Sequence, residues 1–207
     1  MTRRAQPDPL TELFADARKP DPALLRVLHD ELVRRADDEA VLDIAYRTMD
    51  SPFGTVLLAA TARGLLHIGF EIEGLGAVLE ALASEISPRI LLDPRRLDAA
   101  AHQLEEYFAG ERREFDVALD LTLAKGFRRS VLEYLPQITY GTTRSYSAVA
   151  EAVHHPKAAR AVGTACATNP LPLVIPCHRV IKHDGGSGSY RGGASMKRQL
   201  LELERSS

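Results

Sequence analysis

The chain has 207 residues, 45% of them hydrophobic and 26% charged, with a formal net charge of −2, so it can bury one ordinary core or two small ones. Its two cysteines exclude a disulfide framework and a zinc site made of four cysteines. No apolar stretch reaches the roughly 20 residues of a membrane helix, and residues 1–4 are not followed by an apolar signal segment, so we expect a cytoplasmic protein without a membrane partner.

Residues 1–41 predict an amino-terminal extension with one helix. Leucines recur at helical spacing with charged residues between them, which indicates an amphipathic helix over residues 22–36. The apolar stripe consists of Leu24, Leu25, Leu28 and Leu32. A helix of this kind usually packs on the body of its protein, and binding to a partner is the alternative.

Residues 42–122 predict a small α/β domain. Short β-type runs between residues 44 and 70, interrupted by two turn motifs, indicate antiparallel strands. A helix over residues 97–108 follows, since its apolar stripe stops just before a glycine, and residues 115–121 alternate as a further strand would. Nothing in this segment suggests chemistry, so we expect a structural domain.

Residues 123–207 predict a mostly helical domain. Apolar residues at helical spacing indicate helices over residues 127–135, 145–153, 157–167 and 194–204. A tight turn joins the second and third of these, which is the arrangement of a helix-turn-helix. The whole chain therefore predicts an α+β fold, in which a small α/β domain with an antiparallel sheet precedes a helical domain.

Charge separates the two halves of the chain. Residues 1–123 contain 14 basic and 23 acidic side chains, whereas residues 124–207 contain 12 basic and 5 acidic ones. Only the second half suits a polyanion, because Lys and Arg contacts to phosphates raise affinity for nucleic acid without reading its sequence.

The most informative segment is Pro176-Cys177-His178-Arg179-Val180. It follows an apolar run, residues 173–175, that we interpret as buried backbone, so the thiol has a fixed place. A lone cysteine is more often a small buried apolar residue than a reagent, and we interpret Cys166 in that way. A cysteine beside a histidine can also be a nucleophile with its base.

Further short motifs surround this segment: Arg160-Ala161-Val162-Gly163, Asn169-Pro170, residues 188–193 and residues 197–204. Together they resemble the O6-alkylguanine-DNA alkyltransferase family, from about residue 44 to residue 204, with a weaker match at residues 51–54. The resemblance implies DNA repair, in which an alkyl group passes irreversibly from O6-alkylguanine in duplex DNA to the cysteine. It also implies a single turnover and no cofactor, with O4-alkylthymine as a second candidate substrate.

The resemblance assigns the chemistry to four residues. Cys177 is the nucleophile, and because a thiol with an ordinary pKa of about 8.5 is mostly protonated at neutral pH, it needs a base. That base is His178, acting through a water, with Glu204 holding the imidazole. Tyr146 crowds the phosphate beside the target nucleotide and donates a proton to the guanine ring. The alternatives are an ordinary buried tyrosine for Tyr146 and a solvated helix end for Glu204.

Other matched residues are implied to bind the substrate. The pocket for the guanine consists of Asn169, Val180, Tyr190, Arg191 and Lys197, and the turn at the first of these leads into an active-site strand. The second helix of the helix-turn-helix carries small residues, including Ala159, Ala161 and Gly163. Small side chains suit a close approach to a backbone or a narrow minor groove, whereas readout of the major groove needs long polar ones. About half of them could instead pack on a neighbouring helix.

The resemblance also implies how double-stranded DNA is held. The protein binds the minor groove as a monomer, and Arg160 enters the base stack where the target nucleotide is flipped out. Arg128 and Leu132 stand where many members have Gln and Trp, and Thr139 stands where Pro is usual, which we interpret as packing changes. The zinc of some members would lack cysteines here, so we expect no metal.

Two other functions remain open. A cysteine hydrolase could use Cys177, His178 and Glu204, but it does not explain Arg160 or the small-residue helix. A helix-turn-helix protein that binds DNA and senses alkylation without repairing it is the non-enzymatic alternative, against which the cysteine argues.

Overall fold

The computed structural model describes residues 21–39, 41–186 and 188–206. The chain divides into two compact units, Met1–Ala40 and Val41–Ser207. Across the described ranges, no helix is both long and apolar enough to cross a membrane.

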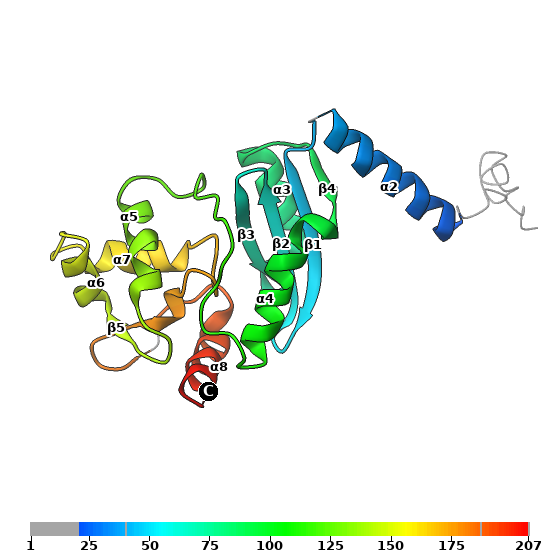
Figure 1. The fold of residues 1–207 in the computed structure, drawn as a ribbon. Helices are drawn as coiled ribbons and strands as arrows, with labels where there is room; N and C mark the ends of the chain where they lie inside the picture. Colours follow the sequence, from blue (N-terminus) through cyan, green and yellow to red (C-terminus); the bar gives the residue numbers. More distant parts are fainter. Residues whose placement is uncertain (1–20, 40, 187, 207) are drawn as a thin grey trace, which may run out of the picture. The chain divides into compact units, whose positions relative to one another are not determined.

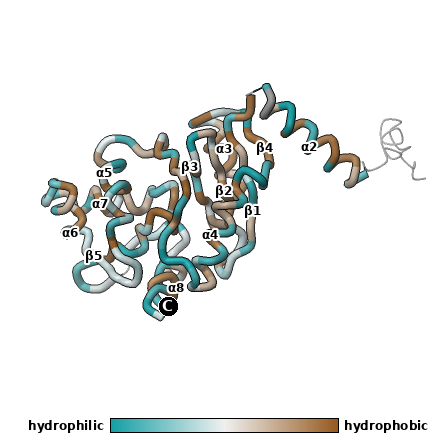
Figure 2. Tube along the Cα trace, in the orientation of Figure 1, coloured by the Kyte–Doolittle hydropathy of each residue, from teal (hydrophilic) through white to brown (hydrophobic). Residues whose placement is uncertain are grey.

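In the first unit the structure describes α2 (Pro22–Asp38), where the leucine spacing predicts a helix. The carboxylate of Asp21 accepts a hydrogen bond from the N–H of Ala23 at 2.9 Å, and the fixed φ of Pro22 suits the first helical position. Hydrophobic and hydrophilic residues alternate along this helix in Figure 2. Its predicted stripe of four leucines is 48% to 56% exposed, and packing of that stripe on the body of the protein stays a prediction.

The second unit begins with a four-stranded sheet, shown in Figure 1. Its strand order is β3 (Gly64–Phe70), β2 (Gly54–Thr61), β1 (Ile44–Ser51) and β4 (Ile90–Leu92). The first three strands pair antiparallel, as predicted, and β4 adds in parallel to β1. The sequence pattern does not predict β4, because three residues are too few to show an alternation.

Helices α3 (Leu75–Glu85) and α4 (Asp98–Phe108) cover opposite faces of this sheet. Alternate residues of β2 serve the two faces, since Leu57 packs in the cluster of α3 and Leu58 in the cluster of α4. Both side chains are fully buried, so this strand is a continuous apolar run and not an alternating one. The position of α4 confirms the predicted helix, whereas α3 is absent from the sequence prediction.

The predicted strand over residues 115–121 is wrong. The segment makes one isolated bridge, between Leu119 and Leu65. Farther along β3, the carbonyl of Pro170 accepts a hydrogen bond from the N–H of Ile68 at 2.8 Å. A loop from the carboxy-terminal part of the chain therefore uses this edge of the sheet, so a full additional strand cannot pair there.

The rest of the second unit is mostly helical, as predicted. It contains α5 (Gly126–Tyr134), β5 (Arg144–Ser145), α6 (Tyr146–Ala152), α7 (Ala159–Ala167), β6 (Val180–Ile181) and α8 (Gly193–Ser206). The helices α6 and α7 form the helix-turn-helix, and β5 and β6 pair in parallel.

One apolar cluster joins the sheet to these helices. It includes Leu58 of β2 and Leu104 of α4 on one side, and Leu132 of α5 and Leu200 of α8 on the other. Cys177 belongs to the same cluster. The predicted nucleophile therefore lies in the main core, between elements contributed by both parts of the unit.

Candidate active site

The backbone places Cys177 at the start of a buried turn. Residues 169–180 are all buried, and the exposed fractions within residues 173–175 are only 1% to 9%, as predicted. The active-site strand implied by the resemblance does not form here. Leu173 has a φ of 76°, which is outside the strand region, and the chain instead makes turns that end in the 3-10 helix Cys177–Arg179.

Asn169 ties this turn to the end of α7. Its side chain is fully buried; Nδ2 donates to the carbonyl of Ile175 at 2.8 Å, and Oδ1 accepts from the N–H of Leu171 at 3.0 Å. The same side chain hydrogen-bonds the thiol of Cys177. Asn169 thus holds both the backbone before the nucleophile and the nucleophile itself.

The Cys177 thiol is protonated in the resting protein. Burial raises its pKa to about 11, although the hydrogen bond from Asn169 and the positive charge of Lys197 act in the opposite direction. The side chain is 1% exposed. A reactive thiolate therefore requires a base inside the protein.

His178, the base predicted from the sequence, forms a buried pair with Glu204. Nε2 of His178 lies 2.7 Å from Oε1 of Glu204, and both side chains are fully buried. Burial raises the pKa of Glu204, but hydrogen bonds from His178 and Arg179 outweigh it and bring the pKa to about 2. The carboxylate is therefore ionised, so Nε2 carries the imidazole proton and Nδ1 keeps its lone pair.

The lone pair of His178 is available in this fold. Nδ1 is buried and has no hydrogen-bond partner among the described residues. Burial lowers the pKa of His178, while the hydrogen bond and the charge of Glu204 raise it. Burial is the larger effect, so the pKa of His178 lies below its ordinary value. The imidazole is therefore neutral at neutral pH and can accept a proton at Nδ1.

Glu204 has three further partners. The guanidinium of Arg179 donates from Nε to Oε2 at 2.9 Å and from Nη2 to Oε1 at 2.9 Å. The N–H of Gly141 donates to Oε2 at 3.0 Å, and the hydroxyl of Tyr107 donates to Oε1 at 2.8 Å. Neither Arg179 nor Tyr107 was predicted from the sequence as a site residue. The first directly follows His178 in the motif, whereas the second lies 97 residues from its acceptor, so no local pattern reports it.

The residues predicted for the guanine pocket gather around Cys177. Nζ of Lys197 donates to the carbonyl of Val180 at 2.6 Å, and Lys197 is fully buried. The ring of Tyr190 lies 6.3 Å from that of His178, and its buried hydroxyl has no partner among the described residues. The guanidinium of Arg191 contacts the carboxylate of Glu73 and donates to the carbonyl of Asn169 at 3.1 Å.

Tyr146 lies where the two helices of the helix-turn-helix meet. It begins α6, directly after Ser145, whose hydroxyl accepts from the N–H of Ala148 at 3.1 Å and caps the helix. A Cβ added to Gly163 of α7 would lie 3.9 Å from the Tyr146 ring. Lys197 lies 5.8 Å above the same ring. Tyr146 is thus held between the helix-turn-helix and the surroundings of the thiol.

The small residues of α7 divide between two roles. Ala161 and Arg160 are exposed and Ala159 is partly exposed, so this side of the helix is open. Ala165 and Cys166 are buried in the core, as expected for packing residues. The helix therefore presents short side chains with Arg160 projecting between them.

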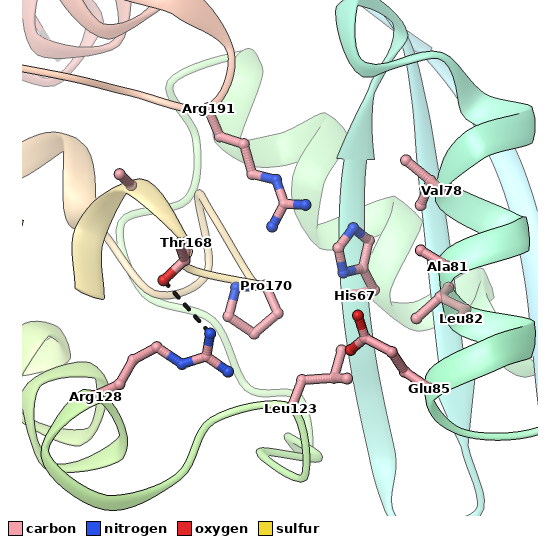
Figure 3. A pocket seen from close by; sticks show the side chains of 11 residues that line it. His67, Val78, Ala81, Leu82, Glu85, Leu123, Arg128, Thr168, Pro170 and Arg191 are labelled. Carbon is pink, nitrogen blue, oxygen red and sulfur yellow. Dashed lines mark hydrogen bonds between the residues drawn. The ribbon is translucent and has the colours of Figure 1, made fainter. Parts of the chain in front are cut away.

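A cavity of about 290 Å³ lies between β3 and α3 on one side and α5 and the end of α7 on the other (Figure 3). His67 points into it; its two ring nitrogens have no partner among the described residues, and burial followed by the charge of Arg191 lowers its pKa to about 3. Arg128, one of the departures from the family pattern, lines the cavity 3.5 Å from the hydroxyl of Thr168. Cys177 is not part of its lining.

Comparison with known proteins decides the family. The family model described as "6-O-methylguanine DNA methyltransferase, DNA binding domain" matches residues 126–206, and the "ribonuclease-like domain" of the same protein matches residues 44–121. This chain belongs to the 6-O-methylguanine DNA methyltransferase family. The family inferred from the sequence is thereby confirmed.

Individual relatives of this methyltransferase family agree. A methylated-DNA–protein-cysteine methyltransferase of Mycobacterium tuberculosis is 43% identical over 163 residues, which are 79% of this chain and 93% of the relative. A protein of the same name from Methanosarcina barkeri is 38% identical, over 77% of this chain and 96% of its own. A crystal structure of Mycobacterium tuberculosis OGT in complex with DNA is 41% identical, with a TM-score of 0.68 over 78% of this chain and 93% of the other.

Helix α2 lies outside both matched segments. Among the residues that the structure describes, no group of three or more His, Cys, Asp or Glu could hold a metal ion.

Proposed function

We propose that this protein repairs DNA by transferring a methyl or other alkyl group from O6 of guanine to the sulfur of Cys177. One observation carries the proposal: the buried thiol adjoins a histidine whose Nε2 lies 2.7 Å from Glu204 and whose Nδ1 has no partner among the described residues. The matched relatives support it, since they are named methylated-DNA–protein-cysteine methyltransferases.

The proton of the thiol has a defined destination in this proposal. It passes through a water to Nδ1 of His178, and the charge of Glu204 stabilises the imidazolium that forms. Successive side chains of a 3-10 helix point in different directions, so a bridging water suits Cys177 and His178 better than direct contact. Glu204 stays ionised throughout, because its pKa is about 2.

The transfer itself is an in-line displacement. The thiolate of Cys177 attacks the alkyl carbon, a carbon–sulfur bond forms, and the bond from that carbon to O6 breaks. The electron pair of the broken bond goes to the guanine, and Tyr146 donates a proton to the ring. Burial raises the pKa of Tyr146 to about 12, so its hydroxyl is protonated and can act as a donor. The thioether that results has no good leaving group, so each molecule reacts once.

The proposed DNA contact is the open side of α7. Exposed Arg160 would enter the base stack and occupy the space left by the flipped nucleotide, which offsets part of the cost of extrusion. The small side chains of Ala159, Ala161 and Gly163 would let the helix approach the minor groove closely. Residues 124–207, with 12 basic and 5 acidic side chains, supply the positive charge.

The flipped guanine would bind next to the thiol. Tyr190 would stack on it, and its hydroxyl, which is buried without a partner among the described residues, could bond the base. The backbone of Val180 and Arg191 would bond its edge, while Lys197 and Asn169 hold the walls of the pocket.

We further propose that residues 42–122 form the structural domain and residues 123–207 the DNA-binding and transfer domain of a monomer. The two matched family segments, 44–121 and 126–206, support this division. Residues 1–41 would then be an extension without a part in the chemistry.

Mass spectrometry after incubation with duplex DNA containing O6-methylguanine tests the proposal. We expect one stable methyl adduct, and peptide mapping should place it on Cys177. Cys166→Ala is the matched control, because that thiol is also buried and should be dispensable for the adduct. Turnover of ester substrates without an adduct would indicate the hydrolase, and tight DNA binding with neither reaction would indicate the sensor.

A further inference from the structure

Tyr107 brings a hydroxyl from the amino-terminal part of the unit into the proposed active site. It lies near the end of α4, the helix that covers one face of the sheet. Its side chain is completely buried, and its hydroxyl donates to Oε1 of Glu204 at 2.8 Å. The same oxygen atom of Tyr107 lies 3.4 Å from Nε2 of His178.

The hydroxyl shares its acceptor with the catalytic imidazole. Oε1 of Glu204 is 2.7 Å from Nε2 of His178 and also accepts from Nη2 of Arg179 at 2.9 Å. A carboxylate oxygen that accepts from three residues is fixed in position and shares its negative charge among them. The hydroxyl of Tyr107 therefore affects both where Glu204 lies and how strongly its charge acts on His178.

Packing alone does not require a hydroxyl at this position. The ring of Tyr107 packs 5.4 Å from that of Phe115 and 6.3 Å from that of Tyr140, contacts that phenylalanine would also make. A buried hydroxyl is costly unless it is hydrogen-bonded, and this one is directed at the carboxylate that holds the base.

We propose that Tyr107 is a positioning residue for alkyl transfer, whose hydroxyl fixes Glu204 and moderates its charge so that His178 stays neutral and able to accept the thiol proton. The inference rests on the proposed function. Through Glu204 it gives the amino-terminal domain an indirect part in the chemistry, whereas the sequence predicts only a structural role for that domain.

Several charged or titratable groups lie around His178, and the charges of Glu204, Arg179 and Lys197 act on its pKa. The groups are Cys177 and Arg179 of its own turn, Lys197 and Glu204 of α8, Tyr107 of α4, and Tyr190. Removing the hydroxyl of Tyr107 leaves the other groups in place. The undivided charge of Glu204 then favours the imidazolium more strongly, so the pKa of His178 rises.

The test is Tyr107→Phe, with Tyr140→Phe as the matched control. Tyr140 belongs to the same aromatic cluster, and its buried hydroxyl has no partner among the described residues. Single-turnover rates are measured from pH 5 to pH 9 with methylated duplex DNA and with free O6-benzylguanine, and melting temperatures are recorded for all three proteins.

We expect Tyr107→Phe to react about 10-fold more slowly with both substrates. This loss is smaller than the roughly 100-fold or greater rate increase that a general base supplies, because His178 itself is kept. The acid limb of its rate profile should move to higher pH, whereas Tyr140→Phe should match the wild type. An unchanged rate for Tyr107→Phe would overturn the inference, and so would a slower rate whose pH profile does not move. A lower melting temperature without any change in rate would overturn it as well. Failure of the wild type to form an adduct would instead overturn the proposed function together with the inference.

Discussion

Replacing Glu204 with glutamine should destabilise the protein in a way that depends on pH. Glutamine keeps the size of the side chain but removes the charge that Arg179 and His178 contact inside the core. The side chain of Arg179 is only 7% exposed, so the variant leaves a buried guanidinium without its counterion. Such a loss usually costs more than the intact ion pair contributes.

The size of the effect follows from the pKa of Glu204, which is 4.5 ordinarily and about 2 in the folded protein. At about 1.4 kcal/mol per pH unit, that difference corresponds to roughly 3 kcal/mol. Because the folded pKa is the lower one, this stabilisation is fully present above pH 4.5 and is lost as the pH falls toward 2. We expect Glu204→Gln to lower the free energy of unfolding by about 3 kcal/mol at pH 7, in the range for broken buried pairs.

Urea denaturation at pH 7 and at steps down to pH 3 measures this free energy. Glu202→Gln is the matched control, since Glu202 is an exposed carboxylate on the same helix, and its free energy of unfolding should change by less than about 0.5 kcal/mol. The gap between wild type and Glu204→Gln should narrow as the pH falls below 4.5. A variant as stable as the wild type at pH 7, or a gap that is constant with pH, would refute the reasoning.

Three further predictions concern the reaction and the extension. Product formation should stop at one equivalent per protein, and Cys177→Ala should bind DNA without any transfer; steady turnover by the pure protein would contradict this. Arg160→Ala should slow repair of duplex DNA far more than reaction with free O6-benzylguanine, because the free base needs no flipping; equal losses would mean that the arginine supports the fold. A chain that starts at Val41 should still transfer the alkyl group, with a loss of a few kcal/mol in stability if the leucines of α2 pack on the body. An unchanged melting temperature with a large loss of transfer would place the extension at the site.

Local patterns predicted those elements whose side chains repeat at a regular spacing. The antiparallel strands and the helices α4 to α8 appear within a few residues of their predicted bounds. The segment 115–121 alternates as well, but the edge of the sheet it would need is partly used by Pro170. The predicted strand fails because another segment of the chain already occupies part of that edge. A pattern within seven residues carries no information about such a distant segment.

The site could be predicted from the sequence only as far as its motifs reach. Cys177 and His178 are neighbours in the chain, and Glu204 was inferred from the family resemblance. The buried partners of Glu204 needed the fold, because the α4 helix must pack against α8 before the Tyr107 hydroxyl can reach the carboxylate. No spacing rule connects two residues that lie 97 positions apart.

The apolar cluster that joins the sheet, α4 and the helical part has a consequence for how this chain can change. Leu58 and Leu104 share it with Leu132 and Leu200, so a change of side-chain volume on one side must be accommodated on the other. The two matched family segments are therefore not interchangeable modules. A chimera that joins one segment of this chain to the other segment of a relative would have mismatched side chains in this shared cluster. The cluster includes Cys177, so the mismatch would reach the proposed nucleophile.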